Sequence, residues 1–186
     1  MNKQQRFKIV ALVGMPGAGK SEVSKVFERN GFSKIRFGDI TDEEVKKRGL
    51  LLNEDNERAV REELRQQHGM AAYAILNLPR INEALRNSGV VIDGLYSWEE
   101  FKFLKDEFAD DLYTVNVWSP PEMRYRRLQN RAVRPLTMEQ SKARDFAEIE
   151  NVNKGGPIAM ADYTIKNDST LENLIRQTRQ IIRVIR

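Results

Sequence analysis

One stretch near the start of the chain, GMPGAGKS at residues 14–21, constrains the fold more than any other. It matches the pattern G-x-x-x-x-G-K-[ST] at every fixed position, and such a loop points successive backbone N–H groups at phosphate oxygens. An apolar segment, 7–13, precedes the loop, and Val23, Val26 and Phe27 follow it at helical spacing. The alternative is a glycine-rich turn that binds nothing, but the order strand, loop, helix favours phosphate binding.

The residue types in this loop suit the triphosphate of ATP. Gly14, Gly17 and Gly19 permit a positive φ and a close approach of the backbone, where a Cβ would block the phosphates. Lys20 is expected to reach the β- and γ-phosphates, and the hydroxyl of Ser21 is expected to coordinate Mg²⁺. The loop residues predicted to contact the nucleotide are Gly14, Pro16, Gly17, Ala18, Gly19, Lys20, Ser21 and Glu22.

Length and composition limit the class of protein. A chain of 186 residues suits one domain with its own core, and 40% hydrophobic with 31% charged residues is typical of a soluble globular protein. The sequence contains no cysteine, which excludes disulfides and thiolate chemistry. No apolar stretch is long enough for a signal peptide or a membrane span, so we expect a cytoplasmic protein without a membrane partner.

Short apolar segments alternate with helical patterns along the whole chain. This alternation predicts an α/β fold in three layers, with helices on both faces of a parallel sheet and right-handed crossovers. The five expected strands are 7–13, 33–37, 90–93, 112–118 and 162–166.

Local signals also predict where helices begin and end. A long helical region at 54–88 is expected to be interrupted by Gly69 and Pro79. Capping patterns predict the starts of four other helices, at Thr41, Ser97, Ser119 and Thr137.

Asp93 ends a short, continuous apolar run, Val90 to Ile92, that is typical of a buried parallel strand. Ligands bind at the carboxyl edge of such sheets, and a carboxylate there can hold Mg²⁺ directly or through water. The alternative is an ordinary turn aspartate before Gly94. We predict that Ser21 and Asp93 together hold the metal ion.

Arginines are concentrated between residues 120 and 152, around a short break that contains Pro135. A guanidinium group can bind two oxygens of one phosphate in a bidentate contact, and it stabilises the charge of the transition state. This region is therefore expected to form a mobile lid over the phosphates. Arg127, Arg131 and Arg144 are the predicted phosphate contacts, whereas some of the other arginines must be ordinary surface charge.

Taken together, these motifs resemble the P-loop nucleoside monophosphate kinase superfamily, nearest to the dephospho-CoA kinases and to adenylate-kinase-related proteins found chiefly in archaea. The resemblance covers nearly the whole chain, and its more diagnostic segments are 119–127 and 158–168. It implies a single P-loop kinase domain over residues 1–186, with a helical acceptor-binding region at 40–88 and an arginine-rich lid at 120–152. By resemblance, Arg127 and Arg131 match the lid arginines, Arg144 matches the basic residue of the following helix, and Asn167 lies near the adenine.

The chain departs from adenylate kinases on the acceptor side. The arginines usually found after the second and third strands are replaced by Ile40-Thr41-Asp42 and by Leu95-Tyr96-Ser97, so ordinary adenylate kinase activity is not expected. Dephospho-CoA kinases resemble this chain in having an aspartate just past the second strand, here Asp39. Asp39 is either a general base for a hydroxyl acceptor or a cap of the following helix.

The predicted function is that of an ATP- and Mg²⁺-dependent kinase acting on a small molecule, either dephospho-CoA or a nucleoside monophosphate. The alternative is a nucleotide-binding regulatory protein or a nucleic-acid-associated P-loop ATPase. A GTPase switch is discounted because Asn153-Lys154-Gly155-Gly156 lacks the aspartate of the guanine-reading motif. The arginines on the last helix are interpreted as a solvated face, so no nucleic-acid partner is expected. The sequence indicates no particular oligomeric state.

Overall fold

The sheet in the computed structural model is parallel throughout and has the strand order β2-β3-β1-β4-β5, over the described residues 7–132 and 135–186. This confirms the predicted five-stranded parallel sheet. The strands are β1 (Ile9–Val13), β2 (Ser33–Arg36), β3 (Val90–Asp93), β4 (Leu112–Trp118) and β5 (Tyr163–Lys166).

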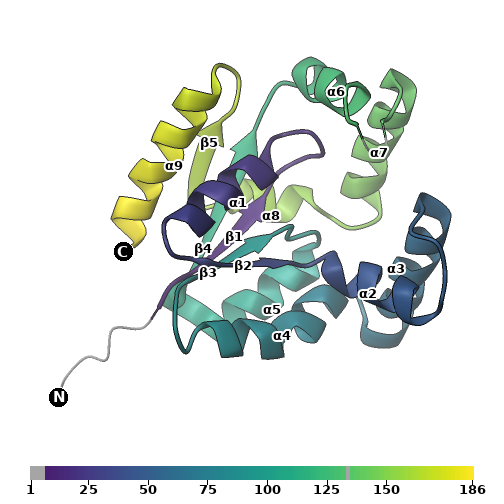
Figure 1. The fold of residues 1–186 in the computed structure, drawn as a ribbon, viewed down its shortest axis with the longest axis horizontal. Helices are drawn as coiled ribbons and strands as arrows, with labels where there is room; N and C mark the ends of the chain where they lie inside the picture. The colour runs from purple at the N-terminus through teal and green to yellow at the C-terminus, as the bar shows by residue number, and fades with distance from the viewer. Residues whose placement is uncertain (1–6, 133–134) are drawn as a thin grey trace.

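Helices cover both faces of the sheet, as Figure 1 shows. Successive side chains of β1 point to opposite faces, so Val10 and Leu12 belong to one core while Ile9 and Ala11 belong to the other. Helices α1 (Lys20–Arg29) and α9 (Leu171–Ile185) contribute to the first core. Helices α4 (Ala72–Ala84) and α5 (Trp98–Phe108) contribute to the second core. Every β1 residue is fully buried, which explains the continuous apolar run in the sequence.

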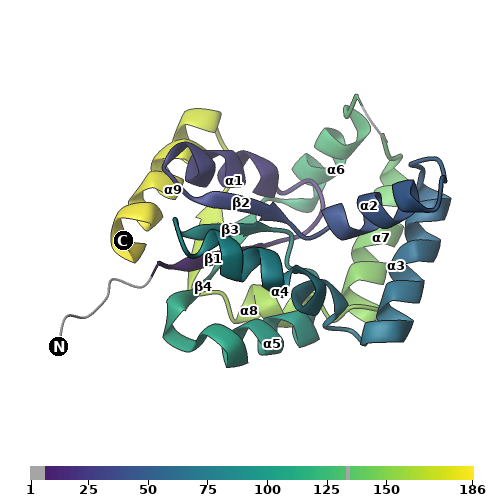
Figure 2. The ribbon, with the colours of Figure 1, turned by 60° about the horizontal axis from the view of Figure 1, so that its bottom comes forward.

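The other helices surround the edge where the parallel strands end. In both views the pair α2 and α3 and the pair α6 and α7 project from the same side of the molecule, beyond the end of β1 (Figures 1 and 2). Helices α3, α6 and α7 fall within the predicted acceptor-binding and lid regions, α2 begins one residue before the first region, and α8 lies beyond the second. Their bounds are α2 (Asp39–Lys47), α3 (Glu54–His68), α6 (Pro121–Gln129), α7 (Met138–Glu150) and α8 (Gly155–Ala159), and a short 3-10 turn, η1 (Ala109–Asp111), precedes β4.

Two of the predicted capping boxes are confirmed, at Ser97 and Thr137. The helix predicted to begin at Thr41 begins earlier, at Asp39, because Thr41 is buried and its hydroxyl lies 2.5 Å from that of Tyr73. Ser119 does not cap α6, because the helix begins at Pro121 with Pro120 at the N-cap position; the Ser119 hydroxyl accepts a hydrogen bond from Arg127.

The predicted interruption at Pro79 is also wrong, because α4 continues through it from Ala72 to Ala84. Proline inside a helix costs about 3 kcal/mol through a lost hydrogen bond and a steric clash. Tyr73, Ala74 and Ile81 are almost completely buried on the same helix, and we infer that this packing offsets the cost. Among the described residues, no helix combines the length and the apolar character needed to cross a membrane.

Candidate functional site

The loop between β1 and α1 has the backbone that its glycines predict. Gly14, Gly17 and Gly19 adopt φ angles of 135°, 76° and 104°. A Cβ at Gly14 or Gly17 would lie 2.3 or 2.7 Å from a backbone carbonyl oxygen, and one at Gly19 would lie 2.3 Å from Nδ2 of Asn167. The loop is therefore packed so closely against its neighbours that only glycine fits at these three positions.

Lys20 lies across this loop and donates hydrogen bonds to the carbonyl oxygens of Gly14, at 2.7 Å, and Met15, at 3.2 Å. Within the described part of the chain no carboxylate lies within ion-pair distance of its ammonium. Burial, followed by the nearby positive charge of Lys154, lowers the pKa of Lys20 to about 7. Lys20 nevertheless remains partly exposed. Lys20 is thus a cation that no carboxylate of the described residues pairs with directly and that an anion can reach.

Two predicted site residues, Arg127 and Asn167, contact each other and pack against the phosphate-binding loop. The guanidinium of Arg127 donates to Oγ of Ser119 and to the carbonyl oxygen of Asn167, each at 3.1 Å. Asn167 in turn donates from Nδ2 to the carbonyl oxygen of Ala18 at 2.8 Å. Burial lowers the pKa of Arg127, because these neutral partners do not balance its charge.

The other two predicted lid arginines are Arg131 and Arg144, and their positive charges repel each other. Burial, and then the positive charge of Arg144, lowers the pKa of Arg131. Arg144 donates from Nε to Oε1 of Glu148 at 3.2 Å. An added anion would therefore relieve repulsion between these two cations.

Glu148 and Lys154 lie beside Arg144 and Lys20, although no sequence motif assigns them to the site. Lys154 is only 1% exposed, and its ammonium contacts Oε2 of Glu148 and lies 5.3 Å from the ring centroid of Tyr96. Burial raises the pKa of Glu148, but the charges of Lys154 and Arg144 hold it below its usual value. Glu148 thus bridges two cations close to Lys20, and only the turn from α7 into α8 brings them together.

Arg124 is a third residue whose place the sequence did not reveal. It is 4% exposed, and its guanidinium binds both carboxylate oxygens of Asp145, at 3.0 and 2.6 Å. It also donates to the carbonyl oxygen of Pro16 at 3.1 Å. Arg124 therefore ties α6 and α7 to the phosphate-binding loop, rather than standing on the surface.

Asp93 lies buried at the carboxyl end of β3, as predicted. Its Oδ2 atom accepts a hydrogen bond from Oγ of Ser24 at 3.2 Å and lies 3.3 Å from Nζ of Lys34. The carbonyl oxygen of Ser21 lies 3.1 Å from the same Oγ and shares its single proton with Asp93, which links the two predicted metal ligands. Ser24 had no signal in the sequence beyond its place one turn after the loop.

These residues fit a magnesium ion that arrives with a nucleotide. The described residues contain no cluster of three or more acidic or histidine side chains that would hold a metal on its own. Mg²⁺ commonly binds through one or two protein oxygens, with waters and substrate phosphates completing its octahedron. The Asp93 carboxylate and the Ser21 hydroxyl supply oxygen ligands of that kind.

Asp39 is the first residue of α2, and Gly38 occupies the N-cap position. The side chain of Asp39 makes no capping hydrogen bond and instead accepts one from Nε of Arg36 at 2.6 Å. The alternative that Asp39 caps the helix is therefore wrong. Its role as a base stays a prediction.

A parallel sheet of this order, with a glycine-rich loop after its first strand, defines a P-loop domain with a kinase-like fold. A family model described as an AAA domain matches residues 10–150. The chain belongs to the UPF0200 family. A UPF0200 protein of Thermococcus onnurineus is 38% identical over 181 residues, which cover 95% of this chain and 97% of the relative. One of Thermococcus kodakarensis is 38% identical over 178 residues, covering 94% and 96%.

Solved structures of similar fold include several kinases. TT1252 from Thermus thermophilus superposes with a TM-score of 0.71 at 18% identity, covering 98% of this chain and all of that one. Shikimate kinase from Bacteroides thetaiotaomicron gives 0.61 at 15% identity, covering 95% and 98%. Dephospho-CoA kinase from Campylobacter jejuni gives 0.57 at 15% identity, covering 96% and 97%. At these identities the likeness shows the fold alone.

Proposed function

We propose that this protein is an ATP- and Mg²⁺-dependent cytoplasmic kinase that transfers the γ-phosphoryl group to a small-molecule acceptor. The observation that carries the proposal is Lys20, a cation surrounded by loop carbonyls and without a carboxylate partner among the described residues. A bound phosphate would supply the missing negative charge and restore the ordinary pKa of the ammonium. The kinase-like fold supports the same assignment.

In this proposal the protein acts by positioning and by charge stabilisation, which dominate phosphoryl transfer. Loop amides and Lys20 hold the β- and γ-phosphates. Three arginines approach the transferred phosphoryl group: Arg127 from α6, Arg131 from the segment that follows α6, and Arg144 from α7. Arg144 must exchange its contact with Glu148 for a phosphate oxygen, so nucleotide binding would loosen the bridge between Arg144 and Lys154.

The metal would be held by Ser21 and Asp93. Bound Mg²⁺ supplies neutralisation of charge on the β- and γ-phosphates. Asp93 is kept in place by Ser24 and Lys34 through Oδ2, and this leaves Oδ1 without a hydrogen bond from the described residues. Asn167, which hydrogen-bonds the loop at Ala18, would lie beside the adenine.

The acceptor would bind between the sheet edge and the helices of residues 40–88. Asp39 is the proposed base for a hydroxyl acceptor, with its carboxylate oriented by Arg36. A phosphate acceptor would need no base. We therefore propose dephospho-CoA or a nucleoside monophosphate as the acceptor, and an Asp39 variant separates them: Asp39→Asn would abolish transfer to a hydroxyl but would spare transfer to a phosphate.

A coupled assay of ADP release, with Mg-ATP and a panel of nucleoside monophosphates and dephospho-CoA, tests the proposal. We expect at least one acceptor to stimulate turnover and Lys20→Ala to abolish it. Arg29→Ala is the matched control, because Arg29 is an exposed cation in the last turn of the same helix and is not assigned to the site. If no acceptor raises the rate of ADP release while a control enzyme is active in the same assay, kinase activity on these acceptors is refuted. ADP release that does not depend on an acceptor would favour a P-loop ATPase.

A further inference from the structure

Helix α9 presents two faces of different chemistry. One face is buried against the sheet and α1 through Leu174, Thr178, Ile181, Ile182 and Ile185. The other carries Arg176, Arg179 and Arg183, and Arg186 follows at the C-cap. We call these four residues the α9 arginine strip. At a rise of 1.5 Å per residue the strip is about 15 Å long.

The charges of the α9 arginine strip are not balanced by acids. None of its four members lies within 4.0 Å of a carboxylate oxygen in the parts of the chain that the structure describes. Arg176 donates to Oδ1 of Asn173 at 2.6 Å and Arg186 donates to the carbonyl oxygen of Asn30, and both of these partners are neutral. Most described arginines elsewhere do pair with acids, Arg29, Arg65, Arg127 and Arg131 being the exceptions; the paired ones are Arg36, Arg48, Arg58, Arg61, Arg80, Arg86, Arg124, Arg126 and Arg144.

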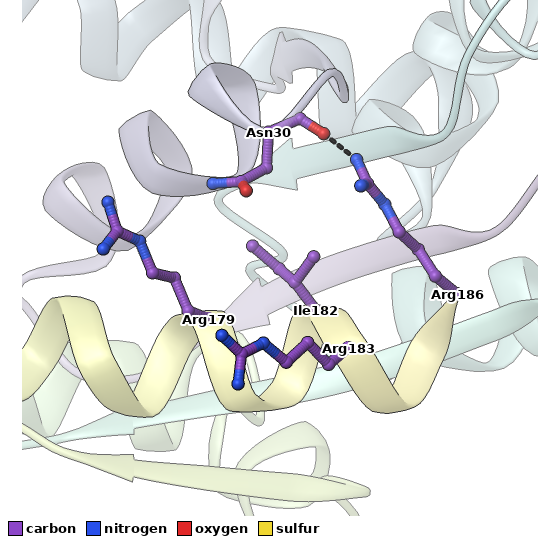
Figure 3. A pocket seen from close by; sticks show the side chains of 5 residues that line it. All are labelled: Asn30, Arg179, Ile182, Arg183 and Arg186. Carbon is purple, nitrogen blue, oxygen red and sulfur yellow. Dashed lines mark hydrogen bonds between the residues drawn. The ribbon is translucent and has the colours of Figure 1, made fainter.

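Two hollows in the surface lie along the α9 arginine strip. Figure 3 shows a hollow above Ile182, bordered by Arg179, Arg183 and Arg186 from α9 and by Asn30 at the end of α1. A second hollow runs along the helix past Arg176 and shares Arg179 and Arg183 with the first. The two hollows therefore adjoin along α9, and Glu172, Ile175 and Gln180 line the second one together with the guanidinium groups.

Other roles explain only part of this pattern. Cations in the last turn of a helix are stabilised by its dipole, which accounts for Arg183 and Arg186 but not for Arg176 and Arg179. Insertion into a lipid bilayer needs an exposed apolar face, whereas the apolar face of α9 is buried on the sheet. Every basic residue on this helix is arginine and none is lysine. Arginine is preferred over lysine where one side chain binds two oxygens of a phosphate in a bidentate contact.

We infer that the α9 arginine strip binds the phosphodiester backbone of a nucleic acid. The strip lies on the outer side of α9, on elements distinct from the phosphate-binding loop, so the inference does not depend on the proposed kinase activity. It replaces the interpretation of this face as merely solvated. Because the contacts are to phosphates, binding is independent of base sequence and weakens as salt is raised.

Fluorescence anisotropy with labelled poly(U) RNA and with a labelled DNA duplex tests the inference. The variant Arg176→Gln/Arg179→Gln/Arg183→Gln removes three charges from the strip while glutamine preserves the helix. The matched control, Arg58→Gln/Arg86→Gln/Arg126→Gln, removes three charges from exposed arginines that are paired with acids elsewhere. Circular dichroism and thermal unfolding establish that both variants are folded.

We expect the wild-type protein to bind at least one of the two probes at physiological salt and the strip variant to lose about tenfold or more in affinity. The slope of log K against log salt between about 50 and 200 mM should fall by about 2 for poly(U), and the control variant should change neither quantity. The inference is overturned if neither probe binds, if both variants weaken binding equally, or if phosphatidylserine vesicles bind as well as the nucleic acids.

Discussion

The contact between Arg124 and the phosphate-binding loop offers a sharp test of how the site is held together. Arg124 is buried in α6 and binds Asp145 of α7 through two hydrogen bonds while it also donates to the carbonyl oxygen of Pro16. The substitution Arg124→Met replaces the apolar stem of the side chain with one of similar size but removes the guanidinium group and its charge. It leaves the Asp145 carboxylate in a site where the side chain is only 12% exposed.

The expected cost follows from that burial. Removing one partner of a buried ion pair costs about 3–5 kcal/mol, because the other charge is left without compensation. The hydroxyl of Tyr125 still donates to Asp145 at 2.9 Å, so we expect the lower end, about 3 kcal/mol. For a chain of this size that corresponds to a fall in Tm of roughly 6–12 °C. ATP affinity should also fall, because Pro16 lies in the loop.

Urea unfolding followed by tryptophan fluorescence measures the free energy of unfolding of Arg124→Met, Asp145→Leu and the double variant. The double variant should cost less than the sum of the two single variants, by about 2 kcal/mol, because it leaves no unpaired charge. Arg126→Met is the control two residues away in α6. Its partner is Glu122 and both side chains are about 70% exposed, so its cost should stay below about 1 kcal/mol.

Two results would refute the reasoning. A loss of less than about 1 kcal/mol in Arg124→Met would show that the pair contributes little to stability. Strict additivity in the double variant would show that Arg124 and Asp145 do not act together.

Three further predictions concern single groups. Because the pKa of Lys20 is about 7 in the free protein, ATP binding at pH 8 should take up nearly one proton, which calorimetry in buffers of different ionisation enthalpy detects and which Lys20→Met should abolish. Gly19→Ala should weaken ATP binding, measured by the same titration, because its Cβ would lie 2.3 Å from Nδ2 of Asn167; unchanged affinity would contradict this packing. Burial raises the pKa of Glu100 from 4.5 to about 7, so the folded state binds the extra proton and loses stability as pH rises through this range. Glu100→Gln should flatten that part of the urea-unfolding profile, and an unaltered profile would count against it.

Features that depend on neighbouring residues were predictable from the sequence. The turn at residues 14–21 is encoded by glycines whose positive φ no other residue adopts easily, and the lysine at its end follows from the same pattern. The capping boxes at Ser97 and Thr137 are local in the same way. The alternation of strands and helices determined the parallel sheet, because parallel strands need helical crossovers.

Similar local patterns failed where a distant residue competed for the same atom. Thr41 has the spacing of a capping box, yet its hydroxyl contacts Tyr73 from another helix. Ser119 precedes a helix, yet Arg127 uses its oxygen. A hydroxyl group binds whichever partner the packing brings closest, and the sequence does not contain that information.

The tertiary structure alone decided what each charged side chain does. Arg124 and Arg127 are one helical turn apart, yet the first is neutralised by Asp145, whereas the second contacts neutral groups beside the loop and no acid among the described residues. Lys154 is buried against Glu148 because α7 turns into α8. The sequence by itself shows how many charges there are and along which helices they lie. Whether a charge is neutralised or available to a ligand depends on which carboxylates the fold places within a few ångströms of it, because electrostatic interactions act through space rather than along the chain.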